Sequence, residues 1–167
     1  MQKFLLTLVV LTLWILYPTS SIEAKAETYT ITPNSDTYNG NFMRASTYNK
    51  YTKHYYLIRS YLEQLEETGG GTLVFEKGTY TVSNVLFVPS NVTIKLQDGA
   101  KIVNGNETGT SKSDADKSIF QFIRPSFGKE EGVYGEYNGE TNISIIGSGT
   151  ATIDLNFEKK YWHYCWP

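Results

Sequence analysis

Short β-rich segments with very short gaps constrain this chain more than any other feature. Five such segments lie between positions 72 and 103, and they are separated only by brief turns. They are Thr72–Phe75, Thr79–Val82, Leu86–Val88, Val92–Leu96 and Lys101–Val103. Gly78, Pro89-Ser90-Asn91 and Asp98-Gly99 supply turn-forming residues between them. The pattern predicts an all-β region, built either from antiparallel hairpins or from the successive sides of a coil.

An internal repeat favours the coil. Six residue pairs share one offset of 51: Asn91-Val92-Thr93-Ile94 recurs as Asn142-Ile143-Ser144-Ile145, and Ala100 and Ile102 recur as Ala151 and Ile153. A coil of a parallel β-helix takes roughly 20 to 25 residues, so we expect the offset to span two coils with insertions. Repeats of this kind are typical of stacked architectures, in which each unit buries its apolar face on its neighbours. A β-sandwich with chance similarity stays open as an alternative.

One amphipathic helix precedes the β-rich region. Its apolar residues recur at helical spacing, and glutamates occupy the other side. The apolar stripe consists of Tyr55, Leu57, Ile58, Tyr61, Leu62 and Leu65. We expect the helix to end at the glycines of positions 69–71, where Gly69 can take the left-handed conformation. The polar stretch 27–53 before it is expected to form an extended lead-in with one short strand at Tyr29–Ile31.

Two polar stretches interrupt the later strands. They are Asn104–Lys117 and Arg124–Thr141, and between them Ser118–Ile123 alternates as a strand should. We expect Ile119 and Gln121 on one face of that strand, and Phe120 and Phe122 on the other. Long loops in a compact domain are often functional, but tolerated surface insertions explain these two equally well.

The segment Met1–Ala26 is expected to be a signal peptide. Lys3 precedes the uncharged, mostly apolar run Phe4–Tyr17, which as a helix reaches roughly 21 Å of the roughly 30 Å hydrocarbon core. Ala24-Lys25-Ala26 has the small residues that signal peptidases require, so we predict cleavage between Ala26 and Glu27. The mature chain would then be secreted, with no membrane segment. An uncleaved anchor is the alternative.

Charge and cysteine content restrict the binding partners and the covalent or metal cross-links that this chain can have. Because the predicted cleavage removes Lys3, Glu23 and Lys25, the net charge changes from −2 to −3. The single domain that remains can bury a sizeable core. No basic block is present, which argues against nucleic acid. Cys165 is the only cysteine, so neither an intrachain disulfide nor a thiolate metal cluster can form.

The glycine-flanked segments resemble those of a known superfamily. Gly69-Gly70-Gly71-Thr72-Leu73-Val74-Phe75-Glu76-Lys77-Gly78-Thr79-Tyr80 looks like the entrance of pectate-lyase-like β-helices, and the stretch 88–102 looks like the next coil. Asn142–Gly149 with Ile153-Asp154 is similar to the Gly-x-Gly-x-Ile-Asp segment of polygalacturonases of glycoside hydrolase family 28. The resemblance covers roughly Tyr55 to Trp162. It implies a right-handed single-stranded parallel β-helix, all-β, whose first coil is capped by the amphipathic helix in residues 54–167.

The resemblance does not supply a catalytic set. Family 28 enzymes carry Asn-Thr-Asp, Asp-Asp, Gly-His-Gly and Arg-Ile-Lys motifs on later coils, and none of these occurs in this sequence. Those motifs provide the paired carboxylates of inverting hydrolysis. Pectate lyases use carboxylate-bound calcium and an arginine base, also on later coils. The catalytic residues are therefore unknown, and by resemblance Asp154 belongs to a structural turn.

Metal and cofactor sites are not expected. Asp114 and Asp116 lie two positions apart and could share a calcium ion on an extended segment, but no motif supports this and we interpret both as solvated. Glu130-Glu131 is interpreted in the same way. His54 and His163 are the only histidines and lie far apart in the sequence, so a two-histidine metal site is not predicted.

Three hypotheses follow for the function. The first is the N-terminal portion of a secreted polysaccharide-degrading protein, of the pectin type, that is inactive alone because its catalytic coils are missing. The second is a complete, non-catalytic carbohydrate-binding or adhesion module that uses the Arg124–Thr141 loop and the aromatic tail, Tyr161–Pro167. The third is a catalytic subunit completed by another chain. In the first and third, further coils or self-association would cover the open C-terminal end, since a bare strand edge invites aggregation.

Overall fold

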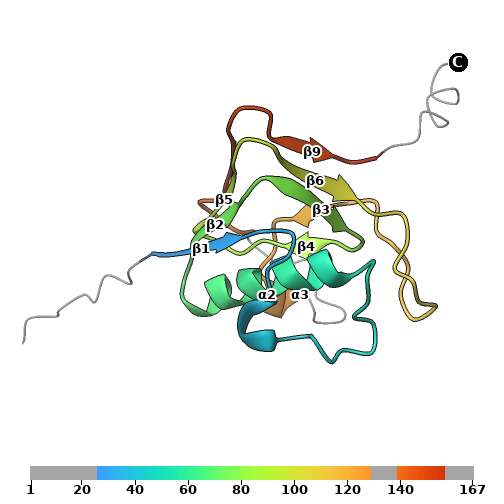
Figure 1. The fold of residues 1–167 in the computed structure, drawn as a ribbon. Coiled ribbons are helices and arrows are strands. Elements are labelled where there is room, and N and C mark those ends of the chain that lie inside the picture. The colour runs from blue at the N-terminus through green and yellow to red at the C-terminus, as the bar shows by residue number, and fades with distance from the viewer. Residues whose placement is uncertain (1–25, 129–138, 157–167) are drawn as a thin grey trace, which may run out of the picture.

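The computed structural model describes residues 26–128 and 139–156, in which strands predominate and helices are few (Figure 1). The strands are β1 (Glu27–Ile31), β2 (Gly71–Phe75), β3 (Gly78–Val82), β4 (Leu86–Phe87), β5 (Val92–Leu96), β6 (Ala100–Asn104), β7 (Phe120–Gln121), β8 (Ser144–Gly147) and β9 (Thr152–Asp154). The helices are the short 3-10 turn η1 (Tyr38–Gly40), α2 (Lys53–Glu67) and α3 (Pro125–Gly128).

The strands form three sheets, and every pairing given by the described residues is parallel. Sheet A has the order β1-β2-β5-β8, sheet B the order β3-β6-β9, and sheet C the order β4-β7. From β2 onward the chain enters the sheets in strict rotation: A, B and C, again A, B and C, then A and B. We call one passage through the three sheets a circuit. The prediction of a β-rich chain is confirmed, and the antiparallel-hairpin alternative is wrong for the strands described.

The repeat offset of the sequence corresponds to one circuit and not two. The shortest circuits run from Gly71 to its register partner Val92, joining β2 to β5, and from Gly78 to Ala100, joining β3 to β6. Strands β5 and β8 are direct neighbours, and their register partners Thr93 and Ser144 are one of the repeated pairs. The expectation of two coils is therefore wrong. The stretch 105–143, which includes most of both polar stretches, lengthens a single circuit, and none of its described residues forms a further strand of sheet A.

Side chains of register partners on neighbouring strands lie next to one another in columns, and the buried columns form one core. Leu73 pairs with Ile94, and Tyr80 pairs with Ile102, and all four side chains are fully buried. The alternation of more and less buried positions in β3, β5 and β6 follows the two-residue period of a strand. Gly78 and Gly99, with φ of +141° and +75°, make the sharp turns into β3 and β6 as predicted.

Helix α2 lies at the end of the sheets opposite β9 (Figure 1). It starts at Lys53 and buries the predicted stripe, with Ile58, Leu62 and Leu65 fully inaccessible to solvent. These residues join the same core cluster as the sheet residues, and the helix contacts β2, β3 and β4. Gly69, with φ of +84°, follows the end of the helix as predicted.

Only the first five residues of the lead-in, 27–31, belong to sheet A, and the expectation of an extended lead-in is wrong for residues 32–52, which form turns and η1. The strand predicted at Tyr29–Ile31 is confirmed and begins slightly earlier, at Glu27, which is the register partner of Gly71. Ile31 is fully buried in the common core. Burial of Ile31 next to Phe75, its register partner, explains why a segment that precedes α2 in the chain adds to the same sheet as β2.

The strand predicted at Ser118–Ile123 is shorter than expected. Only Phe120 and Gln121 form β7, because sheet C offers just the short β4 as a partner. Ile119 is buried, whereas Gln121, which was predicted on the same face, is exposed, and so is Phe122.

Some predictions concern residues outside the described ranges. They are the greater part of the signal peptide, Glu130-Glu131, His163 and the aromatic tail. Within the described ranges, no helix combines the length and the apolar character that crossing a membrane requires.

Candidate functional site

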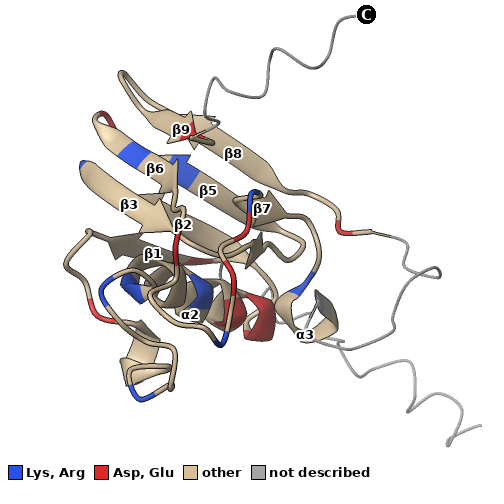
Figure 2. Ribbon diagram, turned by 90° about the vertical axis from the view of Figure 1, so that its right-hand side faces the viewer, with Lys and Arg blue, Asp and Glu red and all other residues tan. Residues whose placement is uncertain are grey.

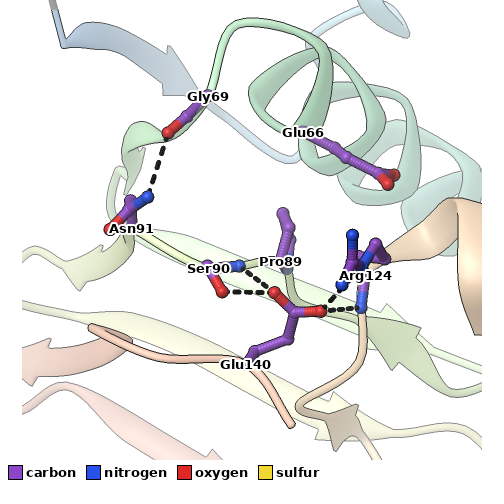
Figure 3. A pocket seen from close by; sticks show the side chains of 7 residues that line it. All are labelled: Glu66, Gly69, Pro89, Ser90, Asn91, Arg124 and Glu140. Atoms are coloured by element: carbon purple, nitrogen blue, oxygen red, sulfur yellow. Dashed lines mark hydrogen bonds and ion pairs between the residues drawn. The ribbon is translucent and has the colours of Figure 1, made fainter. Parts of the chain in front are cut away.

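A cleft of about 320 Å³ lies where α2, sheet A and the segment after β7 meet (Figure 3). It is lined by Glu66, Gly69, Pro89, Ser90, Asn91, Arg124 and Glu140. Glu66 comes from the last turn of α2, and Ser90 from the turn between β4 and β5. Arg124 immediately precedes α3, and Glu140 precedes β8. The cleft therefore joins segments that lie far apart in the sequence.

Glu140 is the most strongly held side chain in the cleft. One carboxylate oxygen, Oε2, accepts the Ser90 N–H at 2.8 Å and also the Ser90 hydroxyl. The other oxygen, Oε1, accepts the Arg124 N–H at 3.0 Å and the Arg124 Nε–H at 3.2 Å. Ser90 Oγ in turn accepts the Thr141 N–H at 2.9 Å. Only 4% of the Glu140 side chain is exposed, so this carboxylate fastens the turn before β5 to the segments before α3 and β8.

These contacts decide the protonation state of Glu140. Burial alone would raise the pKa of its carboxyl, but the hydrogen bonds from Ser90 and Arg124 and the charge of Arg124 outweigh burial and lower the pKa. A carboxylate that stays ionised cannot serve as a general acid at neutral pH, and four donors already occupy its two oxygens. The geometry therefore fits a structural clamp better than a catalytic group.

Glu66, the second carboxylate of the cleft, is also engaged. Its Oε2 accepts the Ser126 N–H at 2.9 Å, and its Oε1 accepts the Ser126 hydroxyl. Ser126 lies in the first turn of α3, so Glu66 binds the helix start, where backbone N–H groups lack intrahelical partners. Both oxygens of each carboxylate in the cleft therefore already accept hydrogen bonds from the protein.

Arg124 supplies the positive charge of the cleft. Its guanidinium forms an ion pair with Glu140 through Nε at 3.2 Å, while 51% of its side chain remains exposed to solvent. Figure 3 shows Arg124 below Glu66, on the side of the cleft away from Gly69 and Asn91. A planar guanidinium at an accessible rim is suited to a carboxylate-bearing ligand, because its N–H groups match two carboxylate oxygens.

Asn91, which lines the cleft on the side of sheet A, is hydrogen-bonded to Asn142 of the next circuit. Asn142 Nδ2 donates to Asn91 Oδ1 at 3.0 Å, and Asn91 Nδ2 donates to the Gly69 carbonyl oxygen at 3.3 Å. Both residues have positive φ, +61° for Asn91 and +57° for Asn142, a conformation that asparagine tolerates better than most residues. The repeated asparagine of the sequence therefore marks the same turn in two successive circuits.

The aspartates considered from the sequence lie outside the cleft. Asp114 and Asp116 are exposed, and Asp116 Oδ1 accepts the Ser118 N–H at 2.8 Å. Asp154 Oδ1 accepts the Asn156 N–H at 2.9 Å, and its Oδ2 lies 3.1 Å from Lys101 Nζ. These contacts, the one from Asn156 first, lower the pKa of Asp154. Within residues 26–128 and 139–156, no three His, Cys, Asp or Glu side chains gather as a metal site would require.

His54 has a structural position at the start of α2. Its Nδ1 accepts the Thr81 N–H of β3 at 2.9 Å, and Nε2 lies 3.1 Å from the Pro33 carbonyl oxygen. Since a backbone N–H can only donate, the ring is neutral and carries its proton on Nε2. Burial lowers the pKa of His54, and the neighbouring Lys53 lowers it further. A second hollow of about 170 Å³ borders this histidine, with Asp36 and Lys53 on its wall.

Comparison of the chain with protein-family models, with curated proteins and with solved structures found no match.

Sequence reasoning missed the cleft because its residues carry no motif. Glu140 and Arg124 belong to the Arg124–Thr141 loop, which the second hypothesis named as a binding element without singling out residues, and Ser90 was singled out only for its turn chemistry. One signal was present: Ser90-Asn91 and Thr141-Asn142 share the offset of 51, which places two hydroxyl–amide pairs side by side once the circuit length is known.

Proposed function

We propose that this chain is the N-terminal part of a secreted, right-handed parallel β-helix protein that handles a pectin-type polysaccharide, and that it has no turnover of its own. The observation that carries this proposal is the rotation of the chain through three parallel sheets, with circuits as short as the one from Gly71 to Val92. The rotation agrees with the resemblance to pectate-lyase-like proteins. Long parallel strand stacks of this kind present extended surfaces suited to polymeric ligands.

The state of the carboxylates supports the absence of turnover. Hydrolysis of a glycosidic bond needs one protonated and one ionised carboxyl group on the two sides of the bond. Among the described residues, the two carboxylates of the cleft are both committed to protein donors, and Glu140 has a lowered pKa. The catalytic groups of such a protein would have to come from further circuits.

The structure around Glu27 supports processing at the predicted site. Strand β1 begins at Glu27, and every described helix and strand lies between Glu27 and Asp154. Cleavage between Ala26 and Glu27 would thus leave the sheets whole. N-terminal sequencing of protein recovered from the medium of an expressing host should give Glu-Thr-Tyr-Thr, and protein retained in the cell with Met1 at its start would contradict secretion.

Turnover is tested with polygalacturonate and with methyl-esterified pectin. The purified chain from Glu27 to Pro167 should release no reducing ends and form no unsaturated product, with or without added calcium, beyond the rate in buffer. Turnover of either substrate by the chain would contradict the proposal.

The runner-up is a non-catalytic carbohydrate-binding module, and the half-exposed Arg124 at the cleft favours it for acidic sugars. If the chain is such a binding module, it should bind oligogalacturonate and should not bind a neutral glucan of equal length. Arg124→Ala should weaken binding about tenfold or more, since a charge-assisted hydrogen bond contributes roughly 1.5 to 3 kcal/mol. Arg44→Ala, at an exposed position outside the cleft lining, is the matched control. Equal affinity of both variants would exclude the cleft as the sugar site.

A further inference from the structure

His54 joins three parts of the chain at the start of α2. Its Nδ1 accepts the Thr81 N–H of β3 at 2.9 Å, and its Nε2 donates to the Pro33 carbonyl oxygen at 3.1 Å. The ring also packs on Tyr80, with the two ring centroids 5.9 Å apart. One side chain of α2 is thus bonded both to the first strand of sheet B and to the turn that follows β1.

The Thr81 N–H belongs to an edge strand. β3 is the first strand of sheet B, and within residues 26–128 and 139–156 its only strand neighbour is β6. The N–H groups on the outer side of such a strand need partners from elsewhere, because an unpaired edge is a template on which another strand can add. His54 supplies the partner of Thr81, so it takes the place that a further strand would have.

Only the neutral ring of His54 can make both bonds. The backbone N–H of Thr81 must donate, so Nδ1 offers its lone pair and the single ring proton lies on Nε2. In the doubly protonated ring both nitrogens are donors, and Nδ1 would then point a proton at the Thr81 N–H. The Pro33 carbonyl oxygen could still accept from Nε2. A second proton therefore removes the contact with β3 and spares the contact with Pro33.

The charges near the ring oppose a second proton in this position. The first turn of α2 reads Lys-His-Tyr-Tyr and contains no acidic residue, so the charge of Lys53 adds to the positive end of the helix dipole. Figure 2 shows basic residues toward the start of α2 and acidic residues at its end. Asp36 is the carboxylate on the wall of the neighbouring hollow, and Tyr48 and Tyr80 are the phenols beside the ring. Burial, and after it the charge of Lys53, lower the pKa of His54.

Contacts on both sides of this region limit how much of the chain can move when the ring leaves β3. Before it, Ile31 is fully buried in the common core. After it, the Tyr38 N–H donates to Ser60 Oγ of α2 at 2.8 Å. Within α2, Ile58 is fully buried one turn after the histidine. Loss of the contact with β3 therefore frees the first turn of α2 and residues 32–36, and it leaves the core in place.

We propose that His54 is a latch that acid opens. The neutral ring holds the first turn of α2 against β3, and the doubly protonated ring releases Thr81 while it keeps its bond to Pro33. The Thr81 N–H then faces solvent on an unpaired edge of sheet B. This inference rests on the contacts of α2 with β3 and with the turn after β1, and it is independent of the proposed function.

Amide hydrogen exchange of the chain from Glu27 to Pro167, which contains every described helix and strand, tests the latch. NMR gives the protection of each amide, corrected for the intrinsic effect of pH on exchange. Protection of the Thr81 amide should fall as the pH is lowered below about 6.5, by about tenfold for each pH unit until the ring is protonated in the folded chain as well, because opening takes up one proton. It should stay about tenfold or more below the protection of Ile102, in the middle strand of sheet B, since the opening is local.

Two variants separate the latch from other effects of pH. His54→Gln keeps an acceptor and a donor but does not titrate, so protection of Thr81 should not change with pH over this range. Glu107→Gln, at an exposed loop position, is the matched control and should retain the pH dependence of the unmodified chain. A folded His54→Gln protein that retains this pH dependence would overturn the proposal.

The unmodified chain gives a second decision that needs no variant. The ¹⁵N shifts of the imidazole should place the proton on Nε2 at neutral pH, and the titration of His54 should coincide with the end of the fall in Thr81 protection. Thr81 protection that is constant below about pH 6.5 would contradict the latch. So would Thr81 protection equal to that of Ile102 at every pH, because exchange would then require unfolding of the whole sheet.

Discussion

Glu140 ties together parts of the chain that the sequence holds far apart. Its carboxylate accepts hydrogen bonds from Ser90, which precedes β5, and from Arg124, which precedes α3. Because both oxygens are used and little of the side chain is exposed, the contact depends on an acceptor that no neutral amide can fully replace.

Replacing Glu140 by glutamine should therefore cost stability. The amide nitrogen of Glu140→Gln would face N–H or O–H donors and leave at least one of them unpaired, which costs about 1 to 3 kcal/mol of unfolding free energy. Urea unfolding followed by circular dichroism measures this. Glu107→Gln, at an exposed loop position, should change the free energy by less than about 0.5 kcal/mol. Identical midpoints for the two variants would show that the clamp does not contribute.

His54 makes stability depend on pH in a defined direction. Its pKa is lowered in the folded chain, chiefly by burial, while an unfolded histidine titrates near about 6.5. Between these two values the unfolded chain binds more protons, so folding stability is complete above about pH 6.5 and falls as the pH is lowered through the folded pKa. Protonation would place a proton on Nδ1, where the Thr81 N–H now donates.

The pH dependence can be isolated by mutation. In His54→Gln, the free energy of unfolding should decrease less as the pH falls just below about 6.5. In Glu107→Gln, the decrease should be the same as in the unmodified chain. The lowered pKa values of Asp98, Glu140 and Asp154 belong to carboxyl groups, whose loss of stability occurs at more acidic pH. A His54→Gln protein with the original slope would refute the assignment.

At the scale of elements, β1 and β2 approach each other closely at one glycine. Gly71 has φ of +149°, and a Cβ at this position would lie 2.3 Å from the Glu27 carbonyl oxygen and 2.8 Å from Leu65 Cδ2. Both contacts are too short for any side chain, and one of them is with backbone. A residue larger than glycine at position 71 would therefore clash with β1 through Glu27 and with α2 through Leu65.

Gly71→Ala should therefore loosen β1 from sheet A and lower the free energy of unfolding by about 2 kcal/mol or more. Gly40→Ala is the matched control, because Gly40 also has positive φ, +72°, but no atom lies within 4 Å of the added Cβ. Its cost should be limited to roughly 1 kcal/mol from the backbone conformation. Amide exchange in β1 should accelerate in Gly71→Ala alone, and equal effects of both variants would contradict the close-approach argument.

Most of the regular elements were predictable with nearly correct bounds. Alternation and glycine turns located β2, β3, β5 and β6, because each strand is bounded by residues that cannot continue it. The helix followed from its apolar stripe. The length of the circuits could not be obtained in this way, since a repeat offset does not reveal how many residues are looped out. The clamp at Glu140 depends on that circuit length, and so it was missed as well.

At the scale of the whole molecule, the two ends of the described sheets differ in how much of the core is covered. α2 covers the first circuit, whereas β8 and β9 end the core with partly exposed isoleucines. A chain of stacked circuits gains its stability from nearest-neighbour contacts, so a terminal circuit has fewer of them than an internal one. We expect local opening of the sheets to begin at β8 and β9, which amide exchange can detect.

The central claim is that the repeat offset spans one circuit, so that β5 and β8 are neighbours. The direct test is a disulfide between Thr93→Cys and Ser144→Cys in a Cys165→Ser background. These positions are register partners on parallel strands, whose Cα atoms lie within the range that a disulfide can bridge. Thr93→Cys with Thr152→Cys, which joins sheet A to sheet B, is the control. Near-complete oxidation of the first pair and persistence of free thiols in the control are the predicted results, whereas a first pair that stays reduced in folded protein, or a control that oxidises as readily, would contradict the one-circuit pairing.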